Sequence, residues 1–182
     1  MEVVLYGQRG KVLAKDKNNY PLGFYPNSPV AVNLSAITPI AKTVPAGSQS
    51  QVWFAFDIIN MLNRPIGIVT LSGNMEGTAL GEDAEAIYWY DGTNLLGVSK
   101  IDADNSIVLS TDEQPCVPSC EPLFLVPRYS KKTINVRADI APSATSGSTM
   151  VFQITGSDEI QTPDRLPIFG KFPITGNEFT IK

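Results

Sequence analysis

The chain has 182 residues, with 14 lysines and arginines against 18 aspartates and glutamates, two cysteines and no histidine. Without histidine it cannot build a Ser-His-Asp or Cys-His catalytic system or a His-ligated zinc site. A net charge of −4 provides no basic surface for a phosphate backbone, so nucleic acid is not an expected partner. No apolar run approaches the ~18 to 20 residues of a membrane span, so no membrane span is expected.

Residues 1–29 differ in pattern from the rest and predict an extended N-terminal arm ahead of one domain over residues 30–182. The arm opens with a short apolar run, Val3, Val4, Leu5 and Tyr6, followed by a polar, turn-rich tether. A tether of about 20 residues extends ~60 Å when stretched, enough to carry this run to a neighbouring subunit as a donated strand. The alternative is that the run folds back onto its own sheet as an edge strand. Met1 is either a native start or a methionine placed before a mature segment, because residues 1–15 lack a signal-peptide apolar run.

From residue 30 onwards the dominant pattern is a period of two, which predicts half-buried strands. It is clearest over residues 133–140, where Ile134, Val136, Ala138 and Ile140 alternate with polar residues. Further strands are expected at residues 52–58, 66–71, 86–90, 95–100, 106–110, 150–154, 167–174 and 178–181. The residues expected to form the core together are Val52, Phe54, Phe56, Ile134, Val136, Ile140, Phe152 and Ile154. With at most one or two helical turns, one near residues 81–86, the prediction is an all-β chain forming an antiparallel β-sandwich of immunoglobulin-like or jelly-roll type.

Loop carboxylates form two candidate calcium sites. The first is Asp102, Asp104 and Asn105, and the second is Glu82, Asp83 and Glu85. Loop oxygens at the ends of a sandwich can hold Ca²⁺, but neither set matches the twelve-residue calcium loop, and one loop supplies too few of the six to eight ligands needed. Solvated turn residues are therefore the simpler interpretation, and otherwise a neighbouring subunit would have to complete the shell.

Tyr88 and Tyr90 are expected on one face of a strand, with Ile87 and Trp89 on the core face. The tyrosines fit cross-strand aromatic packing, a subunit interface or a sugar-stacking platform. Asn33 begins the only glycosylation sequon, Asn33-Leu34-Ser35, which matters only in an exported chain.

Cys116 and Cys120 are separated by three residues and flanked by Pro115 and Pro122. This spacing favours a small disulfide-closed loop. Zinc needs about four ligands, and a redox pair normally has two intervening residues. A disulfide would indicate an oxidising compartment.

Several segments together resemble the immunoglobulin-like modules of bacterial and archaeal surface proteins. They are Ile87-Tyr88-Trp89-Tyr90-Asp91-Gly92-Thr93, Leu96-Gly97, residues 131–140 and residues 146–154. The resemblance covers about residues 30–182 and implies a fold more than an activity. Residues 34–39 and 46–49 are similar to subunits of archaeal extracellular tubes, the cannulae. That likeness implies polymerisation by a donated N-terminal strand, with calcium at subunit contacts.

These observations favour a non-enzymatic subunit of an extracellular or cell-surface filament, tube or layer, with copies of itself as partners. A carbohydrate-binding or adhesion module with glycan partners is the first alternative, using Tyr88, Tyr90 and loop aromatics such as Tyr25. A virion decoration or fibre protein is the second. An enzyme comes last, because a histidine-free carboxylate site would be its only plausible form.

Overall fold

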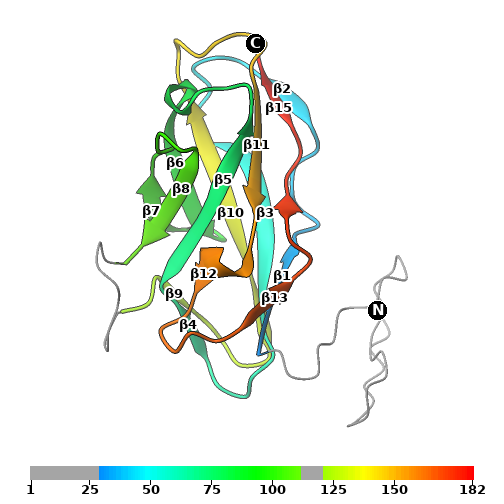
Figure 1. The fold of residues 1–182 in the computed structure, drawn as a ribbon, viewed down its shortest axis with the longest axis vertical. Helices are drawn as coiled ribbons and strands as arrows, with labels where there is room; N and C mark the ends of the chain where they lie inside the picture. The colour runs from blue at the N-terminus through cyan, green and yellow to red at the C-terminus, as the bar shows by residue number, and fades with distance from the viewer. Residues whose placement is uncertain (1–28, 112–120) are drawn as a thin grey trace.

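Two β-sheets pack face to face in the computed structural model, which describes residues 29–111 and 121–182 (Figure 1). The first sheet has six strands in the order β13-β1-β3-β10-β6-β7. Their bounds are Ile168–Gly170 (β13), Val30–Leu34 (β1), Gln51–Asn60 (β3), Ser130–Ile140 (β10), Ala84–Asp91 (β6) and Asn94–Ser99 (β7). The chain is thus all-β and forms a β-sandwich, as the sequence predicts.

The second sheet has seven strands, with β12, β5, β11, β15 and β2 in order, β14 paired to β11 and β8 paired to β5. The bounds are Lys42–Val44 (β2), Thr70–Gly77 (β5), Ser106–Ser110 (β8), Thr149–Ile154 (β11), Ile160–Gln161 (β12), Ile174–Thr175 (β14) and Phe179–Ile181 (β15). A separate pair joins Ile66–Ile68 (β4) to Phe124–Val126 (β9). The helical turns of the described residues are the 3₁₀ segments Gly81–Asp83 (η1) and Ser157–Glu159 (η2), in line with the expected one or two.

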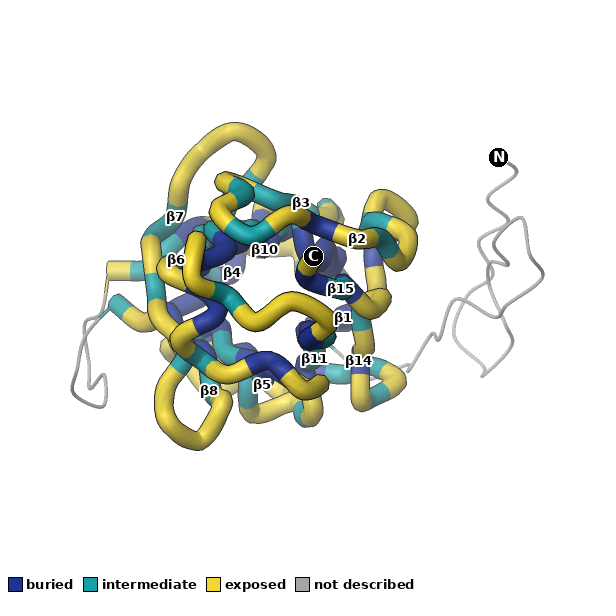
Figure 2. The backbone as a smooth tube through the Cα atoms, turned by 90° about the horizontal axis from the view of Figure 1, so that it is seen from above, coloured by how far each residue is buried: buried dark blue, intermediate teal, exposed yellow. Residues whose placement is uncertain are grey.

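The two narrow sides of the sandwich are closed differently. On one side the chain passes from β1 in the first sheet to β2 in the second, where β2 pairs in parallel with β15. On the opposite side β7 and β8 approach each other from different sheets (Figures 1 and 2). A side chain on Gly97 would lie 2.5 Å from a Leu109 methyl, so glycine allows this close approach. The two narrow sides of the sandwich therefore differ in structure.

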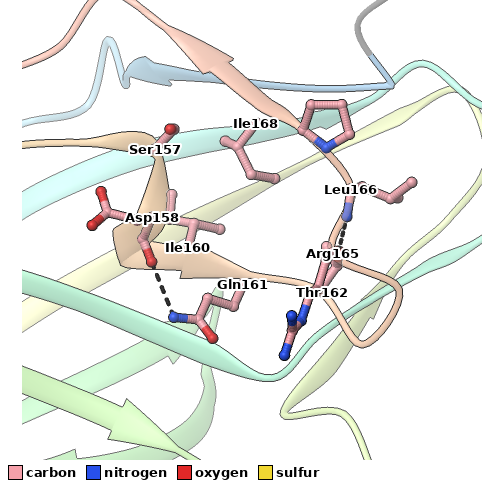
Figure 3. A pocket seen from close by; sticks show the side chains of 9 residues that line it. Ser157, Asp158, Ile160, Gln161, Thr162, Arg165, Leu166 and Ile168 are labelled. Carbon is pink, nitrogen blue, oxygen red and sulfur yellow. Dashed lines mark hydrogen bonds between the residues drawn. The ribbon is translucent and has the colours of Figure 1, made fainter.

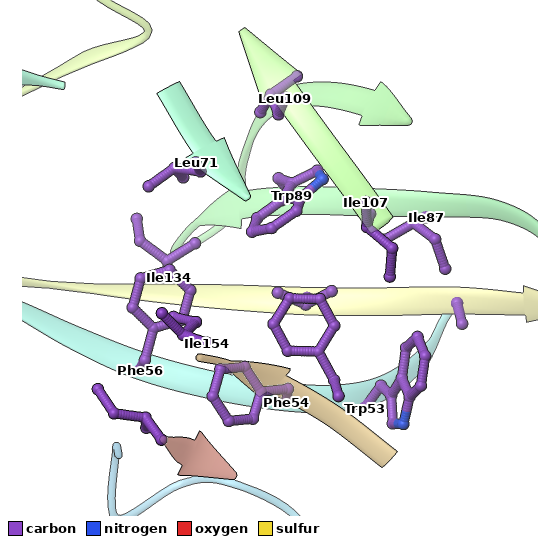
Figure 4. Packing of buried hydrophobic residues seen from close by; sticks show 14 of the residues in the cluster. Trp53, Phe54, Phe56, Leu71, Ile87, Trp89, Ile107, Leu109, Ile134 and Ile154 are labelled. Carbon is purple, nitrogen blue, oxygen red and sulfur yellow. The ribbon is translucent and has the colours of Figure 1, made fainter. Parts of the chain in front are cut away.

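The core lies between the sheets and contains seven of the eight residues that the sequence assigns to it. Phe54, Phe56, Ile134, Val136, Ile140, Phe152 and Ile154 are all buried. Trp53, Phe54, Phe56 and Trp89 point into the same interior (Figure 4). The Phe152 ring lies 4.8 Å from Phe54, 5.6 Å from Trp53 and 5.7 Å from Trp89, centre to centre.

Val52 is the exception, and its predicted burial is wrong because of a β-bulge. Val136 pairs with Phe54, whereas the next residue, Arg137, pairs with Val52. Trp53 is therefore an extra residue in β3, which reverses the alternation on the strand before it. As a result Trp53 is buried at 1% exposure, and Val52 is only half-buried.

Candidate functional site

The outer face of the β6–β7 hairpin carries a mixed aromatic and aliphatic surface. Ile87 and Trp89 are fully buried, so Tyr88 and Tyr90 project from the other face, as the alternation predicts. Tyr88 lies opposite Val98 and Tyr90 lies opposite Leu95 on β7. Residues directly opposite in a sheet share a face. Tyr88, Tyr90, Leu95 and Val98 therefore form one surface, called here the hairpin strip.

Local structure fixes the hairpin. Gly92 occupies a left-handed turn conformation, with φ of 62°, between the two strands. At the far end of β7 the buried Trp89 Nε1 donates a hydrogen bond of 2.7 Å to Ser99 Oγ. The strand is thus held at both ends, while Leu95 and Val98 stay 47% and 51% exposed.

The two tyrosines are already engaged by residues of β10. Tyr88 Oη donates to Asp139 Oδ2 at 2.8 Å, and this hydrogen bond to a carboxylate raises the pKa of the Tyr88 phenol. The Arg137 guanidinium lies over the Tyr90 ring at 4.6 Å from its centre. One face of the Tyr90 ring is therefore covered, and both rings are half-buried. The open apolar area of the hairpin strip is mainly aliphatic.

A small hollow of about 230 Å³ adjoins the tyrosines, lined by Gln49, Ser50, Tyr88, Tyr90 and Asp139. The Ser50 amide donates to Asp139 Oδ1 at 2.5 Å, which joins the start of β3 to β10. The hollow combines aromatic rings with amide, hydroxyl and carboxylate groups, which are the groups that orient a polar ligand.

β7 is also the last strand of its sheet. Within the described residues it pairs with β6 alone, so its other edge has no partner strand. Its sequence, Asn-Leu-Leu-Gly-Val-Ser, contains no charge and no proline. Natural edge strands usually carry such features to prevent pairing with other chains. The edge of β7 therefore lacks these protective features, although β8 of the second sheet packs close to it at Gly97.

A second exposed apolar surface lies on the opposite side, at the end of β1 and in the segment that joins it to β2. Leu34, Ile37 and Ile40 are 45%, 61% and 81% exposed and form the crossover patch. The segment is held against β3, because Ser35 N donates to Ala55 O at 2.9 Å and Thr38 Oγ1 donates to the same carbonyl at 2.6 Å. The exposed side chains thus sit on an anchored backbone.

Another hollow, of about 450 Å³, lies between η2 and β13 (Figure 3). Its lining mixes apolar Ile160, Leu166 and Ile168 with Asp158 and Arg165. Its loop is braced internally: the Leu166 amide donates to Thr162 Oγ1 at 2.8 Å, and Gln161 Nε2 donates to Asp158 O at 3.2 Å. The lining comes from one stretch of the chain, residues 157–168, which returns from η2 to β13. The sequence pattern predicts no functional role for this stretch.

The first predicted calcium set lies in the tight turn between β7 and β8. Asp104 Oδ1 accepts from the Ser106 amide at 3.0 Å, and the Asn105 amide donates to Asp102 O at 2.9 Å. The hydrogen bonds from Ser106 lower the pKa of Asp104. Asp102, Asp104 and Asn105 are exposed neighbours in this turn.

The second predicted calcium set contains both exposed and buried carboxylates. Glu82 and Glu85 are exposed, whereas Asp83 is buried, and its carboxylate accepts from the amides of Leu80 at 2.8 Å and Thr145 at 2.9 Å. No group of three or more acidic or cysteine side chains arranged to hold a metal occurs in the part of the chain that the structure describes. Calcium at either set stays a prediction, and it would need ligands from a second molecule.

The remaining predicted residues are placed as follows. Asn33 is exposed on β1, where a sequon would be accessible. The predicted donor run at residues 3–6 and the predicted Cys116–Cys120 disulfide lie outside the described residues, and both stay predictions. In residues 29–111 and 121–182 no helix has the length and hydropathy that crossing a membrane requires.

Comparison with known proteins finds similarity only among solved structures. No family model and no curated protein matches the chain. The sixth cohesin of Acetivibrio cellulolyticus scaffoldin B, solved in complex with a dockerin, is 18% identical with a TM-score of 0.40, covering 84% of this chain and 97% of that one. AvmM, which catalyses macrocyclisation in alchivemycin A biosynthesis, is 12% identical with a TM-score of 0.39, covering 85% and 89%.

A family 123 glycoside hydrolase from Clostridium perfringens is 8% identical with a TM-score of 0.38, and the match covers 85% of this chain but 27% of the hydrolase. The three proteins differ in activity, and likenesses this loose assign no role to any residue here. The predicted β-sandwich is shown by the two packed sheets themselves, and the likeness to cannula subunits gains no support.

Proposed function

We propose that the protein is a non-enzymatic structural subunit that assembles with copies of itself into an extracellular or cell-surface filament, tube or layer. The observation that carries this proposal is the edge of β7, which has no charge, no proline and no hydrogen-bonded partner strand within the described residues, beside the exposed Leu95 and Val98. A strand added there would gain main-chain hydrogen bonds along β7 and place its own side chains beside Leu95 and Val98 on the same face. Edges of this kind promote association between chains.

The proposed donor is the apolar run Val3, Val4, Leu5 and Tyr6 of a neighbouring subunit. Within the part of the chain that the structure describes, every strand of the two sheets lies between residues 30 and 181, and the core between them is buried. Donation would thus extend the first sheet at β7 and would not complete the core. The subunit is accordingly expected to fold without its arm, in contrast to proteins whose core lacks a strand.

Deletion of residues 1–15 tests this proposal. Size-exclusion chromatography with light scattering and negative-stain electron microscopy should show assemblies of the full chain and monomers of the truncated one. At a concentration low enough for the full chain to be monomeric as well, the full and truncated chains should have the same melting temperature. Leu5→Asp should reproduce the deletion, whereas Lys15→Asp, in the same arm but outside the apolar run, should assemble normally. A full-length protein that stays monomeric at high concentration would contradict the proposal.

A carbohydrate-binding module is the second candidate, favoured by the hollow beside Tyr88 and Tyr90. Asp139, Gln49 and Ser50 supply the polar groups that hydroxyl-rich ligands require. The covered face of Tyr90 weighs against it, because sugar stacking needs an open ring. Binding on a glycan array that Tyr88→Ala abolishes, while Val98→Ala retains it, would favour this function over assembly.

A further inference from the structure

We infer that subunits associate head to tail, with the β7 side of one sandwich against the crossover patch of the next, giving an open-ended filament. The inference rests on the proposed self-assembly and specifies its second surface. Two exposed apolar surfaces carry it: Leu95 and Val98 of the hairpin strip, and Leu34, Ile37 and Ile40 of the crossover patch. Ile40 and Ile37 are the more exposed of these, at 81% and 61%, and a covering surface would remove this apolar area from water.

The two surfaces lie on opposite narrow sides of the same sandwich. Among the described residues, β7 is the outermost strand at one end of the six-stranded sheet, and β1 lies near the other end between β3 and the short edge strand β13. The views in Figures 1 and 2 agree on this separation. A surface that meets a different surface on its partner makes a heterologous contact. Such contacts repeat into rings or open filaments, whereas a two-fold contact stops at a dimer.

Charge distribution supports the same pairing. The turn after β7 carries Asp102 and Asp104 against Lys100, so its balance is negative. The opposite side carries Lys42 on β2 and Lys171 after β13 against Glu178, so its balance is positive. Contact between unlike sides brings opposite charges together, whereas contact between like sides brings like charges together.

The origin of the arm fits this arrangement. β1 begins at Val30, on the side of the sandwich that carries the crossover patch, and 29 residues precede it. A neighbour that docks its crossover side against β7 therefore also places the root of its arm on the side facing that strand. One neighbour would supply both the strand and the patch, so the two contacts reinforce each other.

Mixing two blocked variants tests the inference. Val98→Asp disables the β7 side and Ile40→Asp disables the crossover side; both side chains are exposed, so both variants should fold with wild-type circular dichroism. Alone, each variant should lose the filaments seen for the wild type. Mixed in equal amounts they should form one species of twice the 19.7 kDa subunit mass and nothing larger, because each pair retains one intact contact. Leu125→Asp, at a 52% exposed position on β9, is the matched control and should assemble normally.

The outcomes separate the inference from the proposal on which it rests. A monomeric wild type overturns self-assembly itself. A wild type that assembles while the mixture stays monomeric, or while each variant alone still forms a dimer, overturns the head-to-tail arrangement and favours a two-fold contact. Normal filaments from Ile40→Asp show that the crossover patch is not a contact.

Discussion

β10 and the β1–β2 crossover use the same residue types for opposite purposes. In β10, Ile134, Val136 and Ile140 are at most 2% exposed, whereas Ile37 and Ile40 of the crossover are largely exposed. β10 lies between β3 and β6 in the middle of a sheet and faces a second sheet, so every second residue is buried. The crossover leaves one sheet for the other and has no layer above it. Position in the sandwich, and not hydropathy alone, decides which apolar residues stabilise the fold and which remain available for contact.

Truncating a core side chain should lower the free energy of unfolding more than any other change considered, and far more than truncating a crossover side chain. Phe54 is fully buried against Phe56 and Phe152, at ring distances of 5.7 and 4.8 Å. Phe54→Ala should lower the free energy of unfolding by about 3 to 5 kcal/mol. The matched change Ile40→Ala should alter it by less than about 0.5 kcal/mol in the monomer, because the side chain touches mainly solvent. Urea unfolding measures both, and a cost below about 1 kcal/mol for Phe54→Ala would show that its surroundings relax into the cavity.

Removing a buried carboxylate should give the next largest loss in the free energy of unfolding. The Asp83 carboxylate accepts hydrogen bonds from the amides of Leu80 and Thr145, tying η1 to the loop after β10. Asp83→Ala leaves both amides without this acceptor and should cost about 2 to 3 kcal/mol. Glu82→Ala, at an exposed neighbouring position, should be nearly neutral. Equal unfolding midpoints for the two variants would mean that water replaces the carboxylate.

The proposed Cys116–Cys120 disulfide should stabilise the protein less than a long-range one. A loop this short constrains the unfolded chain little, and its reduction should cost about 2 kcal/mol in the chain-entropy model. Thiol titration of the unreduced, denatured protein should find no free thiol. Two reactive thiols would reject the bond.

The sequence predicts most of β3, β6 and β10 but misses β1, β2, β9 and most of β5, and two of these cases have a clear physical reason. β10 alternates strictly from Ile134 to Ile140 because one of its faces lies on the core, whereas residues 53–58 of β3 are all buried. The bulge at Trp53 depends on pairing with Arg137, which lies more than eighty residues away, so no local pattern reports it. β2 and β9 have three residues each and form because a partner strand is present. The alternation of apolar and polar residues that marks a strand cannot be recognised over only three residues.

In the candidate site, too, local alternation predicts some features, whereas others depend on distant strand pairing. Alternation places Tyr88 and Tyr90 outside, which is confirmed. Their partners Arg137 and Asp139 also alternate outwards on β10, but only the register of β10 with β6 brings them to the tyrosines. The crossover patch has no sequence signature, because exposure of Leu34, Ile37 and Ile40 depends on what the sandwich leaves uncovered.

A surface ion pair should give the smallest effect and show how little exposed charge contributes to the monomer. Arg64 and Asp164 form a salt bridge between side chains that are 52% and 44% exposed. Partial burial of Asp164 opposes its ionisation, but the hydrogen bond and charge of Arg64 outweigh it and lower the pKa of the carboxyl. A lowered pKa stabilises the folded state above the unfolded-state pKa of about 3.9, and this contribution is lost as pH falls through the folded-state value. Solvent screening keeps it below about 1 kcal/mol. In a double-mutant cycle with Arg64→Ala and Asp164→Ala, the coupling should be small at pH 7 and absent near pH 2, and a coupling that persists in acid would mean that the two side chains interact by packing rather than by charge.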